Sequence, residues 1–163
     1  TWLALGEVNE QNGFVQFVPR SHKQGCIEHS MTYHPDNYLR RGQQVDAGFD
    51  LSTAEGVCLQ PGEMSMHHGL TVHGSGGNQT DSPRLGIMMT YVPTEVQTPD
   101  SDESAILVRG KDTHGHFQHE SFDPGFATAE NRKLHREIMI RIKDRTLSAQ
   151  GKQQAYGTSP QVP

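Results

Sequence analysis

The stretch that most constrains this chain runs from His67 to Val92, because it holds two extended segments separated by turn-forming residues. Residues 70–73 alternate apolar and polar side chains, which is typical of a strand with one buried face. A run rich in glycine, asparagine and aspartate follows and reverses the chain. In the second segment Arg84 and Gly86 share one face. The pattern predicts a hairpin with His73 ending one arm and Arg84 opening the other.

A histidine at a strand end, with an arginine eleven residues later, suits chemistry at a non-haem iron. Such an iron takes two histidines and one carboxylate on one face. The far carboxylate of 2-oxoglutarate then needs the planar, charged fork of an arginine. Spacing alone leaves a second interpretation open, in which His73 caps a turn and Arg84 makes a surface ion pair.

Ordered motifs in the chain resemble those of the phytanoyl-CoA dioxygenase family. His-Gly-Ser-Gly-x-Asn begins at His73, Pro-Arg follows at residues 83–84, and the next strand ends in Tyr-Val-Pro. Upstream come three more similar segments in the family's order: Trp2-Leu-Ala-Leu, Asn12-Gly13 and Pro19-Arg-Ser-His-Lys. The resemblance covers roughly residues 1–95. One departure is Arg20, which stands where the family has glycine and leaves the geometry of that turn open.

The resemblance implies a mainly all-β fold, a double-stranded β-helix or jelly roll. It implies an enzyme that uses Fe(II), 2-oxoglutarate and O2 to hydroxylate a small organic substrate. His73 would be a metal ligand, Arg84 would hold the far carboxylate of 2-oxoglutarate, Ser75 would assist Arg84, and Trp2 would pack beside the cosubstrate. Two alternatives stay open: a halogenase of the same family, and a non-catalytic jelly-roll binding module.

The remaining two iron ligands are harder to place. The only His-x-Asp triplet is His34-Pro35-Asp36, where the proline cannot donate to a sheet ladder. The family also places its triplet before the Trp-x-Ala-Leu strand. We therefore expect the other ligands upstream of Thr1 and the chain to be a fragment, with a jelly roll incomplete at its N-terminus. His67 and His68 have no arginine at the family interval, so each is expected to line the pocket or end a strand.

Outside the central stretch, turn signals and alternation predict further elements. Asn12-Gly13 predicts a hairpin that pairs Thr1–Val8 with Phe14–Val18. Residues 24–55 read as an irregular loop and are a candidate substrate lid. Shorter strands are expected at residues 56–60, 63–67 and 104–108.

The C-terminal third predicts a loop, a helix and a tail. The histidine-rich residues 113–119 are expected to form a loop rather than a metal site, because no carboxylate stands at a ligand-like spacing. Thr128 is a predicted N-cap for a helix over residues 128–146. We expect a partial jelly-roll domain over residues 1–127, this helix packed on it, and a mobile tail over residues 147–163.

Composition excludes several partner classes. The net charge of -5 argues against nucleic acid, and no apolar or basic run suggests a membrane. Only 33% of residues are apolar, which favours a soluble protein with long loops. Two cysteines are too few for a disulfide framework, so two reduced cysteines in a cytoplasmic protein are expected. The expected partner is a small-molecule substrate, as the family resemblance implies.

Overall fold

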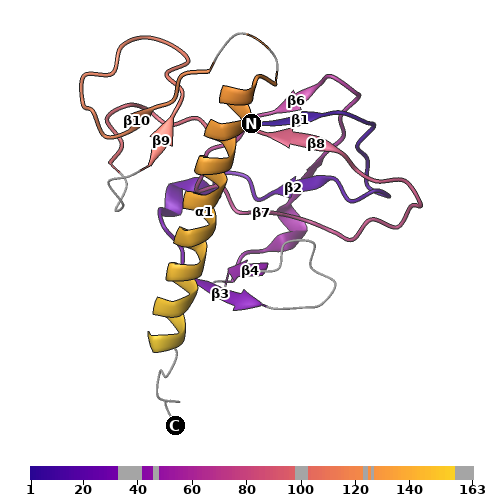
Figure 1. Cartoon of the computed structure of the whole chain (residues 1–163). Coiled ribbons are helices and arrows are strands. Elements are labelled where there is room, and N and C mark those ends of the chain that lie inside the picture. Colours follow the sequence, from indigo (N-terminus) through magenta and orange to yellow (C-terminus); the bar gives the residue numbers. More distant parts are fainter. Residues whose placement is uncertain (33–41, 46–47, 98–102, 123–124, 126, 157–163) are drawn as a thin grey trace. The chain divides into compact units, whose positions relative to one another are not determined.

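The computed structural model describes residues 1–32, 42–45, 48–97, 103–122, 125 and 127–156 (Figure 1). It is mostly β-structure with one long helix. The chain divides into two compact units, Thr1–Tyr91 and Val92–Pro163. Within the described ranges, no helix combines the length and apolar character that crossing a membrane requires.

Two three-stranded antiparallel sheets form most of the first unit. One sheet has the order β6-β1-β8, with β6 at Met64–Ser65, β1 at Trp2–Ala4 and β8 at Gly86–Met88. The other has the order β5-β2-β7, with β5 at Glu55–Val57, β2 at Val15–Phe17 and β7 at His73–Ser75. Figure 1 shows β6, β1 and β8 running side by side. Every strand therefore pairs with a segment distant in sequence.

This pairing corrects both predicted hairpins. β1 and β2 do not pair with each other, and neither do β7 and β8, because each member of a pair lies in a different sheet. Asn12 and Gly13 do form a turn: Gly13 has a φ of 78°, and Asn12 exchanges side-chain hydrogen bonds with Asn9. However, Val8 first bridges to Leu59, so the chain changes sheets before it reaches β2.

A small core lies between these strands. Ala4, Val8 and Leu59 are buried, and Trp2, Phe14 and Val57 pack against them. Because Ala4 belongs to one sheet and Val57 pairs within the other, the cluster joins the two sheets. Burial of such side chains contributes about 25 cal/mol per Å² of apolar surface.

The turn at Arg20, where the resembled family has glycine, keeps a backbone geometry that favours glycine. Arg20 has a φ of 64° and a ψ of 3°, in the left-handed region. The next residue, Ser21, is 2% exposed; its hydroxyl donates to the Val18 carbonyl and accepts from the Val72 amide at 2.8 Å each. Ser21 thus fastens the turn and η1 (Ser21–Gln24) to the residue that precedes β7.

The segment from 24 to 55, predicted as irregular loop, contains regular structure. β3 (His29–Thr32) and β4 (Gly42–Val45) pair antiparallel, and η2 (Leu51–Thr53) follows. Neither strand alternates clearly between apolar and polar residues, so no local pattern predicted them. Its role as a substrate lid stays a prediction.

In the second unit, β9 (Ser104–Ala105) pairs parallel with β10 (Gln118–His119), and α1 spans Ala129–Tyr156. Thr128 caps the helix as predicted, since its hydroxyl accepts from the Asn131 amide at 3.2 Å. The helix continues to Tyr156, so the predicted tail was wrong over residues 147–156. Leucine, alanine, glutamine and lysine there favour helix, and Gly151 costs only about 1 kcal/mol relative to alanine.

Candidate active site in the first unit

The predicted iron ligand and its neighbours project from one face of β7. His73 and Ser75 are two residues apart on this strand, so their side chains point the same way. On the adjacent strand Phe17 stands opposite His73, and Val15 stands opposite Ser75. Two cross-strand pairs therefore lie side by side on β2 and β7, roughly 7 Å apart along the strands. We call them the His73–Phe17 row and the Ser75–Val15 row.

The His73 ring is oriented by its own chain. Its Nδ1 lies 2.7 Å from the Thr71 carbonyl oxygen. Because a carbonyl can only accept, Nδ1 must carry the proton, and in the neutral ring Nε2 then has the lone pair that a metal needs. A backbone carbonyl that holds one ring nitrogen in this way is the usual support for a metal-binding histidine. The supporting group is a backbone carbonyl, so no residue type in the sequence could have identified it.

The side chain of Arg84, which lies just before β8 of the β6-β1-β8 sheet, contacts Ser75 of β7. Its Nη2 donates to Ser75 Oγ at a long 3.5 Å, and its guanidinium carbon lies 5.3 Å from the Trp2 ring centroid. A cation over an indole face is attracted by about 0.5–1 kcal/mol at an exposed site. Of the three residues predicted as one cosubstrate pocket, Arg84 thus contacts both of the others, although they come from three different strands or their ends.

Gly86 makes room for this arrangement. A Cβ at this position would collide with the Trp2 ring. The sequence indicated that the glycine beside Arg84 leaves space against the sheet, and the space holds the indole. Trp2 can therefore lie flat across β8 and beneath the guanidinium.

The rings of His67, Phe17 and His73 form a cluster at the His73–Phe17 row. The His67 ring centroid lies 4.7 Å from that of Phe17 and 4.7 Å from that of His73. His67 stands two residues beyond Ser65, the last residue of β6, which pairs with Trp2. Burial lowers the pKa of His67, and the neighbouring His73 lowers it further. Sequence reasoning named His67 without placing it, and it missed Phe17.

The other candidate histidines take different positions. His68 accepts from the Leu70 amide at 3.1 Å through Nδ1, and its ring lies 5.5 Å from that of His22. It therefore supports a local turn. The triplet His34-Pro35-Asp36 lies outside the described residues.

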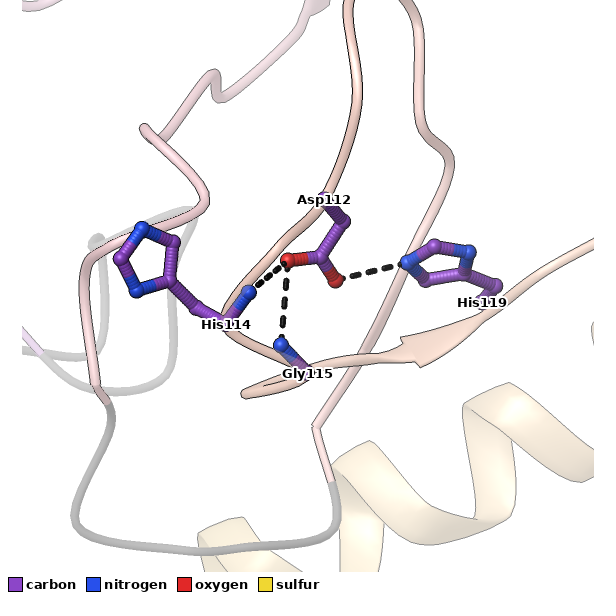
Figure 2. A network of polar contacts seen from close by, with 4 residues as sticks. All are labelled: Asp112, His114, Gly115 and His119. Carbon is purple, nitrogen blue, oxygen red and sulfur yellow. Dashed lines mark hydrogen bonds and ion pairs between the residues drawn. The ribbon is translucent and has the colours of Figure 1, made fainter.

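The histidine-rich loop of the second unit is organised by a carboxylate that the sequence interpretation overlooked. Asp112 Oδ1 accepts from the amides of His114 and Gly115, and Oδ2 lies 2.8 Å from His119 Nε2 (Figure 2). The two amides, with the His119 contact, lower the pKa of Asp112 to about 2. Residues 113–117 are a loop, as expected, but residues 118–119 form β10, and a carboxylate does stand beside His119.

Three or more histidine, cysteine, aspartate or glutamate side chains do not gather as a metal-binding group anywhere among the residues that the structure describes. His73 is therefore not accompanied there by the second histidine and the carboxylate of a facial triad.

Comparisons with known proteins identify the family of the chain. A family model described as phytanoyl-CoA dioxygenase (PhyH) matches residues 1–86, which include Trp2, His73, Ser75 and Arg84. The chain belongs to the phytanoyl-CoA dioxygenase family. This confirms the resemblance drawn from the motifs, and the family is one of Fe(II)/2-oxoglutarate-type oxygenases.

Individual relatives agree with this membership. A probable phytanoyl-CoA dioxygenase of Caenorhabditis elegans is 28% identical over 91 residues, covering 55% of this chain and 29% of the relative. A phytanoyl-CoA dioxygenase domain-containing protein 1 homolog of Caenorhabditis briggsae is 30% identical over 90 residues, covering 51% and 30%. This chain thus spans less than a third of the length of either relative.

A solved structure is also similar. The apo form of ThoJ, a non-heme monooxygenase, superimposes with a TM-score of 0.77 at 28% identity. The similarity covers 92% of this chain and 54% of ThoJ. The mostly β fold with its single helix is consistent with a jelly-roll-like member of the family.

Proposed function

We propose that this chain forms part of an Fe(II)- and 2-oxoglutarate-dependent oxygenase that hydroxylates a small organic substrate. We further propose that the two sheets of the first unit belong to a double-stranded β-helix. The observation that carries the proposal is the convergence on one strand face: His73 and Ser75 project together from β7, and Ser75 receives Arg84.

The residues present fit the two groups that the family implies. His73 presents Nε2 because Thr71 holds Nδ1, which is what a metal ligand requires. Arg84 is half-buried, is positioned by Trp2 and Ser75, and has no carboxylate partner among the described residues. Its guanidinium can therefore hold the far carboxylate of 2-oxoglutarate with paired, charge-assisted hydrogen bonds.

When bound, Fe(II) with 2-oxoglutarate and O2 supplies the oxidation, in which the 2-oxo acid yields succinate and CO2 and one oxygen atom enters a substrate C–H bond. The residues of this chain position the reactants. His73 holds the metal, Arg84 and Ser75 fix the distal end of the 2-oxo acid, and Trp2 closes one side. We propose that the second histidine and the carboxylate come from a part of the protein outside these 163 residues.

The clamp is tested by anaerobic calorimetry of 2-oxoglutarate with the Fe(II)-loaded protein as encoded, including any residues that precede or follow this chain. Removing one partner of a hydrogen-bonded charge pair costs about 2–5 kcal/mol, so Arg84→Ala should weaken binding roughly 30-fold or more. Arg84→Lys should restore only part of it, because an ammonium cannot make the paired contact. Arg109, which is exposed in the second unit, provides the control, and Arg109→Ala should bind normally. Unchanged affinity of Arg84→Ala would remove the clamp from the proposal.

The reaction class has its own measurement. Succinate formation that depends on Fe(II) separates an oxygenase from a non-catalytic binding module. If the encoded protein binds iron and 2-oxoglutarate but forms no succinate with any C–H substrate tried or in the uncoupled reaction, the enzymatic assignment loses its support.

A further inference from the structure

His67 carries a polar atom that the fold leaves unpaired. Its Nδ1 is buried and has no hydrogen-bond partner among the described residues. A buried, unsatisfied polar atom costs about 1–3 kcal/mol. The ring is also held firmly, since it packs at 4.7 Å against both Phe17 and His73. A phenylalanine could fill the same place without that cost.

The other histidines of the 67–73 stretch do not share this property. The Nδ1 of His68 accepts from the Leu70 amide, and the Nδ1 of His73 donates to the Thr71 carbonyl. Both are satisfied by backbone within two residues. The Nδ1 of His67, in contrast, meets neither an amide nor a carbonyl among the residues that the structure describes.

The position of His67 limits what its Nδ1 can meet. The ring lies at the His73–Phe17 row, whereas Arg84 contacts the Ser75–Val15 row. A 2-oxo acid held at its far carboxylate by Arg84 extends toward the metal on His73, because its other end provides the metal-binding oxygens. Its 2-oxo and adjacent carboxylate oxygens would then reach the row on which His67 stands.

We propose that His67 is a positioning residue whose Nδ1–H donates a hydrogen bond to the metal-binding end of the bound 2-oxo acid. This inference rests on the proposed function, since it requires 2-oxoglutarate at His73. Donation to a carboxylate oxygen would satisfy the buried nitrogen and fix the rotation of the 2-oxo acid about its long axis, which the clamp at the far end leaves open.

Three variants of His67 separate the hydrogen bond from the packing. His67→Phe keeps a ring of similar size between Phe17 and His73 but has no polar atom. His67→Asn places an amide near the position of Nδ1, and His67→Gln places it near Nε2 instead. The probe is 2-oxoglutarate itself, titrated anaerobically into the Fe(II)-loaded encoded protein and followed by calorimetry and by the metal-to-ligand charge-transfer absorption of the complex.

His67→Phe should weaken 2-oxoglutarate binding about 10-fold or more, because a hydrogen bond to a charged group contributes about 1.5–3 kcal/mol. The charge-transfer band should shift, and Fe(II) affinity without 2-oxoglutarate should stay within about 2-fold. His67→Asn should restore most of the affinity and His67→Gln should not.

Two results would overturn the inference. If His67→Phe binds 2-oxoglutarate as the parent does, with the same charge-transfer band, His67 only packs, whatever the change in thermal midpoint. In that case Arg84→Ala would still lose binding, and the proposed function would stand. If the Fe(II)-loaded parent protein binds no 2-oxoglutarate, both the function and the inference fail.

Discussion

Two histidine-rich stretches, residues 67–73 and 114–119, look alike in sequence but differ in what their ring nitrogens contact. Each has three histidines and a neighbouring glycine. In the first, His73 Nδ1 meets a backbone carbonyl and its Nε2 has no partner among the described residues. In the second, His119 Nε2 is paired with the Asp112 carboxylate, which also binds two loop amides (Figure 2).

The difference shows that a count of histidines predicts little about metal binding. A ring serves as a metal ligand when one nitrogen is fixed by an acceptor and the other remains available on a rigid element. β7 provides that for His73. The 112–119 loop instead uses a histidine and an aspartate to close itself, so its residues stabilise a turn.

The sharpest test of this comparison exchanges a histidine in each stretch for alanine. In the encoded protein, His73→Ala should raise the Fe(II) dissociation constant by more than about 100-fold, because losing even a supporting partner of a ligand costs 10–100-fold. His119→Ala should leave it within about 2-fold. Anaerobic Fe(II) titration measures both. Equal losses would mean that the two stretches do not differ as described.

A second test asks whether the aromatic support in the first unit serves the site or only the core. Gly86→Ala places a Cβ against Trp2, and Gly56→Ala places one against Phe14. Both should destabilise the protein by about 1–3 kcal/mol through overpacking.

Their effects on the site should differ. Gly86→Ala displaces the indole beneath Arg84 and should also weaken 2-oxoglutarate binding several-fold, whereas Gly56→Ala should not. Denaturant unfolding and calorimetry give the two quantities. A normal 2-oxoglutarate affinity in Gly86→Ala would show that Trp2 supports the sheet and not the clamp.

The third test concerns the second stretch alone and its dependence on pH. The folded pKa of Asp112 is lowered from 3.8 to about 2. Its contacts therefore contribute stability that is complete above 3.8 and is lost as the pH falls through about 2.

Carbon NMR of the Asp112 carboxyl should give a midpoint near 2. In His119→Ala the midpoint should rise only part of the way, because the amides of His114 and Gly115 are the larger causes. A midpoint at 3.8 in the parent protein would show that the loop does not hold the carboxylate in solution.

The smallest expected effect lies in the turn at Arg20, which Ser21 joins to Val72, the residue before β7. Arg20→Gly removes a side chain from a left-handed conformation that costs a non-glycine residue about 1–2 kcal/mol. Glycine offsets part of this gain by adding about 0.4–1 kcal/mol of unfolded-state entropy. We expect a net stabilisation of up to about 1 kcal/mol in denaturant unfolding. Gln24→Gly, outside the left-handed position, should destabilise instead, and a loss of stability in Arg20→Gly would contradict the assignment.

Much of the site was predictable because its residues are chemically distinctive. His73, Ser75, Arg84 and Trp2 were identified from motif and spacing, and Arg84 contacts both Ser75 and Trp2 in the structure. Their roles toward iron and 2-oxoglutarate stay predictions. Strands near these residues were also expected, and β1, β2 and β8 are shorter than predicted. The strand at His73 was misplaced: it was predicted over residues 70–73, but β7 begins at His73 and runs to Ser75.

The sequence failed where the outcome depended on partners distant along the chain. Asn12-Gly13 does form a turn, and Asn78 makes local hydrogen bonds to Thr80 and Ser82 after β7, but a turn signal does not say which strand the chain meets next. Both predicted hairpins were wrong for that reason. Asp112 was missed because its hydrogen-bond partners are backbone amides and a histidine seven residues away.

The amino-acid sequence by itself determined the family, the identity of the histidine and the arginine, and the presence of a strand beside each of them, since these depend on local pattern and residue chemistry. Only the tertiary structure decided that β7 and β8 lie in different sheets, that Thr71 holds His73, and that His67 stands beside it with an unsatisfied nitrogen. The physical reason is that strand partners are fixed by long-range backbone hydrogen bonds and the His73 ring by a nearby backbone carbonyl. Every residue type carries these backbone groups, so no residue type identifies the partner.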